Sequence, residues 1–242
     1  MEPYLFQGIV LPERASISFQ LEFEFSQVSS QITARAKLSI LLNQIMVWVY
    51  SDHNWDIHDL RNIVIELVRT QLDVAGYIYG HAYECQITRV VNQSRGVDYV
   101  FGIDVPCLAN RYEASKRDAA IDSLRRKTGG DNGFYIRRCL ADLSSAMKYA
   151  ADTGFYCYRA IEALRLHCAA INGLSDKDKG KQWERFRSVS GNDEQSLRGL
   201  EAAAKPTRHG DAVDISGTER ARLLTLTWDI VDKYLATVPA PN

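Results

Sequence analysis

The sequence lacks the long apolar segment that a membrane-spanning helix requires. Its longest uninterrupted apolar run, Ile45–Tyr50, has 6 residues, whereas about 18 are needed to cross a bilayer. The segment MEPYLFQGIV at the start carries an acidic residue where a signal peptide needs basic ones, so we do not expect secretion. We therefore expect a cytoplasmic protein with no membrane partner.

The sequence also lacks an excess of either charge and any regular cysteine motif. It has 29 Lys and Arg residues against 30 Asp and Glu residues, so its net charge does not point to nucleic-acid or membrane binding. The 5 cysteines are an odd number without a Cys-x-x-Cys pair, which favours reduced thiols. The 242 residues, 46% of them apolar, are typical of a globular protein with one large or two small domains.

The signatures of common catalytic and metal sites are absent as well. The sequence contains no G-x-S-x-G nucleophile elbow, no Walker-type phosphate loop and no G-x-G-x-x-G motif after a strand. His81 and Cys85 fall on one face of a predicted strand, but at ~3.3 Å per residue they lie ~13 Å apart, too far to share a metal ion. We therefore expect neither a metal nor a cofactor.

Before residue 106 the apolar residues mostly recur with a period of two, which is typical of strands. One helix interrupts this pattern, with Asp56 as its expected cap and Gly76 as its expected end. Residues 1–105 are therefore predicted to form an α+β module, mainly antiparallel β with one helix. Strands are expected at residues 5–10, 17–25, 32–40, 45–50, 77–91 and 97–105.

After Pro106 the apolar period changes to 3.6, which is typical of amphipathic helices. One of these helices is expected to begin at Asn192 and to end near Lys205, because Pro206 disfavours helix at the residue before it. Residues 106–242 are therefore predicted to form an all-α bundle, so the fold class is a two-domain α+β protein. Helices are expected at residues 111–127, 136–147, 158–171, around 183–186, at 192–205 and at 216–238.

Basic residues are concentrated at the start of the second part, on both sides of the glycine-rich loop 128–133. The cluster has two interpretations: a phosphate-binding patch for RNA, or a solvated helix face with paired charges. The residues concerned are Arg125, Arg126, Lys127, Arg137 and Arg138.

One short segment, KPTRHG at residues 205–210, brings together residue types suited to metal-free cleavage of RNA. His209 can exchange a proton near neutral pH, and Arg208 can stabilise the charge of the phosphorane. Upstream, Arg159 and Glu162 are three residues apart and share one face of a predicted helix. The alternative is structural: arginine and histidine at a helix end can cap carbonyl groups, and Arg159 can pair with Glu162.

The segment YCYRAIEALRLH (156–167), followed by KPTRHG and a long last helix, resembles the HEPN superfamily. The resemblance implies a helical bundle of prokaryotic defence and toxin systems, usually dimeric, and in many members a metal-independent ribonuclease. Glu162 or Arg159 would match the polar residue that members carry in an early helix. Members usually separate the catalytic Arg and His by four to six residues, whereas Arg208 and His209 are adjacent here.

Two functions from different classes follow. The first is a non-catalytic binding or scaffold component of a prokaryotic defence or stress system, which the adjacent Arg208 and His209 favour. The alternative is a metal-independent endoribonuclease of the toxin or abortive-infection type, with Arg208, His209, Glu162 and Arg159 in its site. The expected partners are a second copy of the chain, paired through a helical surface, and an RNA or another protein.

Overall fold

The computed structural model describes residues 2–27, 32–211 and 213–239. The chain divides into two compact units, residues 1–103 and 104–242, each with its own hydrophobic core. We call them the sheet unit and the helical unit.

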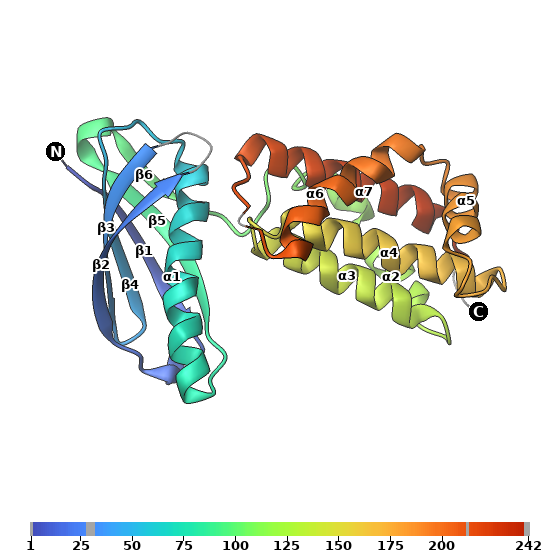
Figure 1. Cartoon of the computed structure of the whole chain (residues 1–242), viewed down its shortest axis with the longest axis horizontal. Coiled ribbons are helices and arrows are strands. Elements are labelled where there is room, and N and C mark those ends of the chain that lie inside the picture. Colours follow the sequence, from blue (N-terminus) through green and yellow to red (C-terminus); the bar gives the residue numbers. More distant parts are fainter. Residues whose placement is uncertain (1, 28–31, 212, 240–242) are drawn as a thin grey trace. The chain divides into compact units, whose positions relative to one another are not determined.

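The sheet unit is a six-stranded antiparallel sheet with helix α1 (Ile57–Tyr79) packed on one face (Figure 1). The strand order is β2-β3-β4-β1-β5-β6, so the chain's first strand lies in the middle of the sheet. This confirms the predicted antiparallel β module with one helix. The strands are β1 (Tyr4–Leu11), β2 (Phe19–Gln27), β3 (Ile32–Leu41), β4 (Gln44–Tyr50), β5 (Glu84–Asn92) and β6 (Val97–Val100).

Helix α1 forms where the apolar period changes. The Asp56 side chain accepts hydrogen bonds from the backbone N–H groups of His58 and Asp59, and so satisfies two donors that the first turn leaves unpaired. Four apolar residues spaced four apart then form one buried row, Leu60, Val64, Val68 and Leu72. This row packs on the sheet face that carries Phe6, Val47 and Ile87.

The helical unit is an all-α assembly around α4 (Figure 1). Helix α4 is buried on most of its circumference, because it contacts α3, α5, α6 and α7. This confirms the predicted helical second part. The helices are α2 (Arg117–Lys127), α3 (Gly133–Lys148), α4 (Thr153–Ile171), α5 (Lys179–Ser190), α6 (Glu194–His209) and α7 (Gly217–Thr237).

The predicted end of α1 at Gly76 is wrong. The helix continues through Tyr79 and ends at Gly80, which has a φ of 66°. Gly76 is needed for a different reason: a Cβ there would lie 2.5 Å from the carbonyl oxygen of His81, so only glycine lets the chain return this closely. Residues 77–79, predicted as strand, are therefore helical.

Several other boundaries also differ from the prediction. Strand β6 ends at Val100 rather than at 105, and α2 begins at Arg117 rather than at 111. The cap of α6 is Asp193, which accepts from the N–H of Ser196, and not Asn192. These shifts are local and leave the order of elements unchanged.

Helix α6 does not end before Pro206, as predicted, but runs through it to His209. Proline frees the carbonyl of the residue four positions earlier, which is Ala202. Ala202 is exposed, so water can satisfy this carbonyl, and the helix has only three residues left to its C-terminus. This correction matters because it moves Arg208 and His209 from a loop into a helix.

Candidate functional site

The predicted catalytic pair lies on the last turn of α6. The residues on this turn that carry the proposed chemistry, Arg208 and His209, are both exposed. Within the described part of the chain neither side chain makes a hydrogen bond or an ion pair. Because adjacent residues on a helix are rotated by about 100° from each other, the two side chains leave α6 in different directions.

The charges of Arg208 and of Glu162, the predicted polar residue of α4, both affect the pKa of Tyr158. Both charges act on the hydroxyl of Tyr158, whose side chain is buried beside Trp183 with ring centroids 6.2 Å apart. Burial, followed by the negative charges of Glu162 and Glu201, raises the pKa of Tyr158 to about 12, while Arg208 opposes the shift. Tyr158 is therefore protonated at neutral pH.

Arg159 is not part of this group. Its guanidinium lies 3.2 Å from the Asp142 carboxylate of α3 and stacks on Phe155, with 5.3 Å to the ring centroid. Asp142 is buried, and burial raises the pKa of its carboxyl, although Arg138 at 3.5 Å opposes this. Arg159 therefore links α3 to α4, and Glu162 is not its partner.

The predicted RNA-binding residues are largely engaged within the chain. Lys127 donates to the carbonyl of Leu235 at 2.5 Å, and Arg137 donates to the carbonyl of Thr128. Arg125 pairs with Asp122 at 3.3 Å, and Arg138 pairs with Asp142. The remaining member, Arg126, is exposed. Two members of the cluster thus form local ion pairs, as the second interpretation describes, and two donate to carbonyl groups near helix ends. RNA binding by the cluster stays a prediction.

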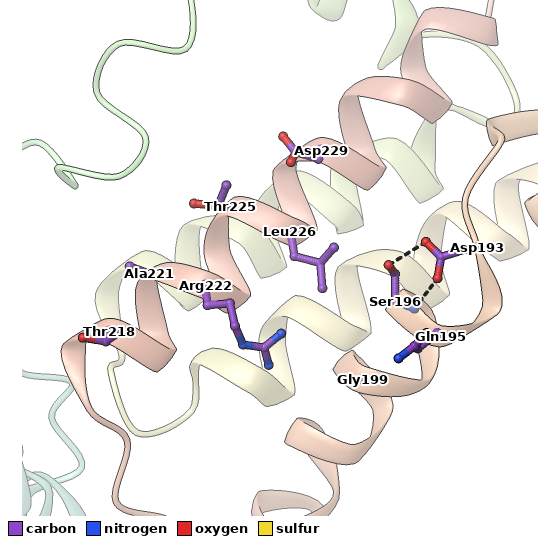
Figure 2. Close-up of a pocket in the computed structure, with 10 residues that line it drawn as sticks. All are labelled: Asp193, Gln195, Ser196, Gly199, Thr218, Ala221, Arg222, Thr225, Leu226 and Asp229. Carbon is purple, nitrogen blue, oxygen red and sulfur yellow. Dashed lines mark hydrogen bonds between the residues drawn. The ribbon is translucent and has the colours of Figure 1, made fainter.

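A groove between α6 and α7 is the site that the sequence did not reveal (Figure 2). Its volume is about 950 Å³, and it is shallow and widely open to solvent. Five of its ten lining residues are small: Ser196, Gly199, Thr218, Ala221 and Thr225. The lining residues are Asp193, Gln195, Ser196, Gly199, Thr218, Ala221, Arg222, Thr225, Leu226 and Asp229.

The charged groups of the groove are already engaged. Asp193 accepts from the N–H and hydroxyl of Ser196, both at 2.7 Å, as Figure 2 shows. Arg222 pairs with Glu219 at 2.7 Å. Asp229 accepts from Arg111 at 2.6 Å. In the sequence, this groove corresponds to small residues three or four positions apart, which are Ser196 and Gly199 on α6 and Ala221 and Thr225 on α7. The periodicity of apolar residues does not reveal them.

The described residues contain no group of three or more His, Cys, Asp or Glu side chains placed to hold a metal ion. Nor does the described part of the chain include a helix of the length and apolar character required to cross a membrane.

Comparison with known proteins gives matches to two family models. Residues 4–101 match the N-terminal domain, and residues 121–238 the C-terminal domain, of a family described as a domain of unknown function (DUF8168). The first match lies in the sheet unit and the second in the helical unit. No curated protein and no solved structure matches the chain.

Proposed function

We propose that the chain is a non-catalytic binding protein whose helical unit receives a helical segment of a protein partner in the α6–α7 groove. The observation that carries this proposal is the groove itself, a site of about 950 Å³ on the surface of a packed bundle. Pockets for small ligands have volumes of roughly 300–1,000 Å³, so this one is at the upper end. The groove runs along two helices, α6 and α7, so its elongated shape suits a peptide segment.

The lining favours a helix as the occupant. Gly199, Ala221 and Thr225 have small side chains, which allow a third helix to approach α6 and α7 at the usual interaxial distance of about 8–10 Å. Leu226 supplies an apolar contact in the middle of the groove. A partner helix would therefore fill the space between α6 and α7 as an additional member of the bundle.

The same lining does not favour catalysis. Among the described residues that line the groove there is no His, Cys or Lys, and its Asp and Arg side chains have partners within the chain. A general acid or base must have its proton-exchanging atom available to a substrate. The resemblance to HEPN proteins supports a setting in a prokaryotic defence or stress system for this binding role.

A displayed library of amphipathic helical peptides, selected against the full chain, tests the proposal. Gly199 lines the groove, and a Cβ there would meet no atom within 4 Å, so the leucine of Gly199→Leu would start in open space at the groove. We expect selected peptides to bind Gly199→Leu at least tenfold more weakly than the wild type. The matched control is Ala202→Leu, on the exposed face of the same helix, which should bind like the wild type. Equal binding to Gly199→Leu, or no selectable peptide, would contradict the proposal.

The metal-independent endoribonuclease is the second candidate, and one observation favours it: Arg208 and His209 are both exposed on the last turn of α6. In this reaction the RNA 2′-hydroxyl loses its proton and its oxygen forms a bond to the adjacent phosphorus, while the bond from phosphorus to the 5′-oxygen breaks and that oxygen gains a proton. His209 would transfer the proton, and Arg208 would stabilise the charge on the phosphate oxygens.

Cleavage of a mixed RNA pool in EDTA distinguishes the two candidates. For an enzyme, His209→Ala should lower the rate by about 10²–10⁴-fold, and Arg208→Ala by about 10²–10³-fold. Arg198→Ala, an exposed arginine on the same helix, is the control and should cleave normally. We expect no cleavage by the wild type. Cleavage that persists in EDTA and disappears in both site variants would replace the binding proposal with the enzyme.

A further inference from the structure

The two central strands of the sheet are largely apolar on both faces, and Gln7 and Gln44 are the exceptions on the face away from α1. On the face under α1, the side chains of Phe6, Val10, Val47 and Val49 are fully buried. The opposite face of the same two strands carries six apolar side chains that are only half-buried. We call these the central stripe: Leu5, Ile9, Leu11, Met46, Trp48 and Tyr50.

An antiparallel sheet with one solvated face normally alternates apolar and polar residues, whereas strands covered on both sides are nearly continuously apolar. Edge strand β2, FQLEFEFSQ, follows the first pattern, with Glu22 and Glu24 away from the core. Strand β1, YLFQGIVL, and strand β4, QIMVWVY, follow the second. Among the described residues of the sheet unit, only α1 covers the sheet, and it covers one face (Figure 1).

Charged residues of both signs surround the central stripe. Lys37 lies 3.5 Å from Glu22, Arg89 lies 2.8 Å from Asp98, and Arg35 stacks on Tyr50 with 4.7 Å to the ring centroid. An apolar centre that includes Trp, Tyr and Met, inside a polar rim, is the composition of a protein–protein interface. The paired charges of the rim do not favour a polyanion such as RNA.

The position of the stripe suits a second copy of this chain. Strands β4 and β1 are third and fourth in the order of six, so the stripe runs along the middle of the sheet. A two-fold axis parallel to the strands, midway between two facing sheets, places each β4 over the partner's β1. The stripe then faces itself, which is the requirement for a symmetric dimer interface.

The size of the face is also sufficient. Six strands at ~4.8 Å spacing and about eight residues at ~3.3 Å each give a face of roughly 750 Å². A stable interface of standard size buries about 800 Å² per partner. We propose that the open face of the sheet is a homodimer interface, with the two sheets packed face to face about 10 Å apart.

Light scattering of the full chain tests this proposal at concentrations from about 1 to about 50 µM, which bracket a dissociation constant in the micromolar range. We expect about twice 27.3 kDa for the wild type and the monomer mass for Trp48→Glu. The control Gln20→Glu adds the same charge at the polar rim of this face, on edge strand β2, and should weaken the dimer only slightly, because exposed rim charges contribute little. A dissociation constant raised at least 100-fold by Trp48→Glu alone is the expected result. A monomeric wild type, or equal dissociation of both variants, overturns the proposal.

Crosslinking provides a measurement that does not depend on a disruptive charge. A short bismaleimide should join two copies of Met46→Cys, at the centre of the stripe, and not two copies of Gln20→Cys beyond the wild-type background. Equal crosslinking of both variants overturns the proposed geometry.

A separate experiment adds labelled single-stranded RNA to the wild type and to Trp48→Glu, with binding measured by fluorescence anisotropy. RNA binding that the substitution abolishes would assign the face to nucleic acid instead.

Discussion

The imidazole Nδ1 of His167 on α4 lies 2.6 Å from the phenol oxygen of Tyr234 on α7, and both side chains are buried. Their rings meet edge to face, with centroids 5.8 Å apart. Burial lowers the pKa of His167 and raises that of Tyr234, so both groups are neutral in the folded protein at neutral pH. The hydrogen bond between them joins the central helix of the bundle to its last helix.

This pair predicts that the helical unit loses stability in mild acid. The folded-state pKa of His167 lies below its unfolded value near 6.5, so the unfolded chain binds more protons between these two values. The contribution of neutral His167 to the stability of the helical unit is therefore complete above pH 6.5. It decreases as the pH falls towards the folded-state pKa. A difference of one pH unit between the folded and the unfolded pKa of His167 corresponds to about 1.4 kcal/mol in the free energy of unfolding.

Thermal unfolding at pH 7.5 and at pH 5.5 measures this effect. Between these two pH values, the unfolding temperature of His167→Gln should fall less than that of the wild type. The exposed His209→Gln is the control and should lose as much stability as the wild type. An unchanged pH dependence in His167→Gln would contradict the assignment.

At neutral pH, Tyr234→Phe should lower the free energy of unfolding by about 1–3 kcal/mol, because it leaves the imidazole nitrogen of His167 buried without its partner.

Most of the fold was predictable because the pattern of each segment agrees with its environment. The alternation over 17–25 becomes β2, whose Phe19 and Phe23 face the core while Glu22 faces away from it. The stripe that contains Leu224 and Val231 becomes the buried side of α7. Trp228 of the same helix packs against the core of its own unit. Pairing of two copies through a helical surface stays a prediction.

The errors arose where one residue type serves two purposes. Glycine both ends helices and permits close approach, and only the return of the chain at His81 shows that Gly76 does the second. Proline breaks helix interiors, but near an exposed C-terminal turn the loss of one hydrogen bond is tolerated, as at Pro206. The α6–α7 groove was missed, because its small residues indicate a groove only once the two helices are known to lie side by side.

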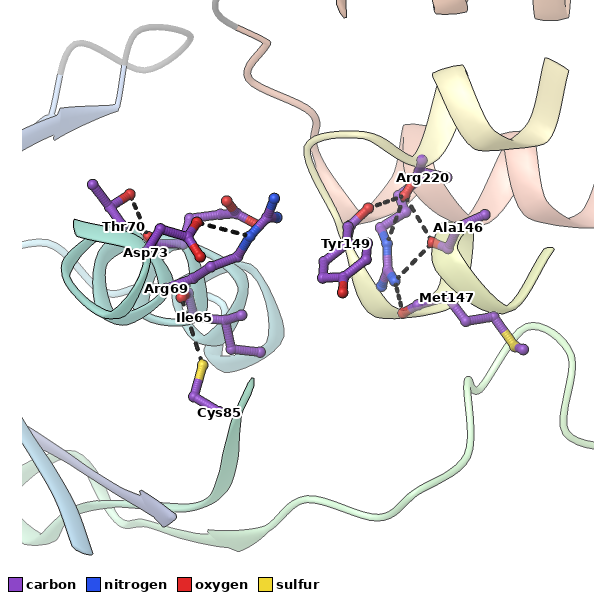
Figure 3. A network of polar contacts seen from close by, with 11 residues as sticks. Ile65, Arg69, Thr70, Asp73, Cys85, Ala146, Met147, Tyr149 and Arg220 are labelled. Atoms are coloured by element: carbon purple, nitrogen blue, oxygen red, sulfur yellow. Dashed lines mark hydrogen bonds and ion pairs between the residues drawn. The ribbon is translucent and has the colours of Figure 1, made fainter. Parts of the chain in front are cut away.

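Arg220 of α7 is expected to be important for the stability of the helical unit. Figure 3 shows its guanidinium at the end of α3, where it donates to the carbonyl oxygens of Met147 at 2.6 Å and Ala146 at 3.5 Å. It also donates to the Thr153 hydroxyl at 3.1 Å. These contacts satisfy carbonyl groups that the last turn of α3 leaves unpaired.

We therefore predict that Arg220→Gln lowers the free energy of unfolding by about 2–4 kcal/mol, since it removes charge-assisted hydrogen bonds from buried carbonyls. Arg222→Gln is the matched control: its pair with Glu219 is exposed, and the change should cost less than about 1 kcal/mol. Denaturant unfolding of the two variants beside the wild type measures the difference. Similar losses in both would show that the contacts of Arg220 do not stabilise the bundle.

The basic cluster around residues 125–138 is predicted to serve the fold more than RNA. Lys127 reaches the carbonyl of Leu235 near the end of α7, and burial lowers the pKa of its ammonium group. Lys127→Ala should therefore lower the free energy of unfolding by about 1–2 kcal/mol. The adjacent, exposed Arg126→Ala should change it by less than about 0.5 kcal/mol. A larger loss of stability in Arg126→Ala than in Lys127→Ala, together with weaker RNA binding by Arg126→Ala, would support the phosphate-binding interpretation.

Two glycines of the helical unit should respond in opposite directions to the same substitution. At Gly154, where α4 crosses α6, a Cβ would lie 2.7 Å from the carbonyl oxygen of Ala203. Gly154→Ala must push these helices apart, and should cost about 1–3 kcal/mol. At Gly199 a Cβ meets no atom within 4 Å, so Gly199→Ala should stabilise α6 by about 0.5–1 kcal/mol through its higher helix propensity.

Calorimetric unfolding of the two variants measures these signs directly. A lower midpoint for Gly154→Ala and a higher one for Gly199→Ala would establish that α4 and α6 touch at Gly154 and that the groove is open at Gly199. A loss of stability in Gly199→Ala would mean that the groove is closed in solution. In that case the Gly199→Leu variant would act on the fold rather than on a bound peptide, and the binding proposal would lose its principal observation.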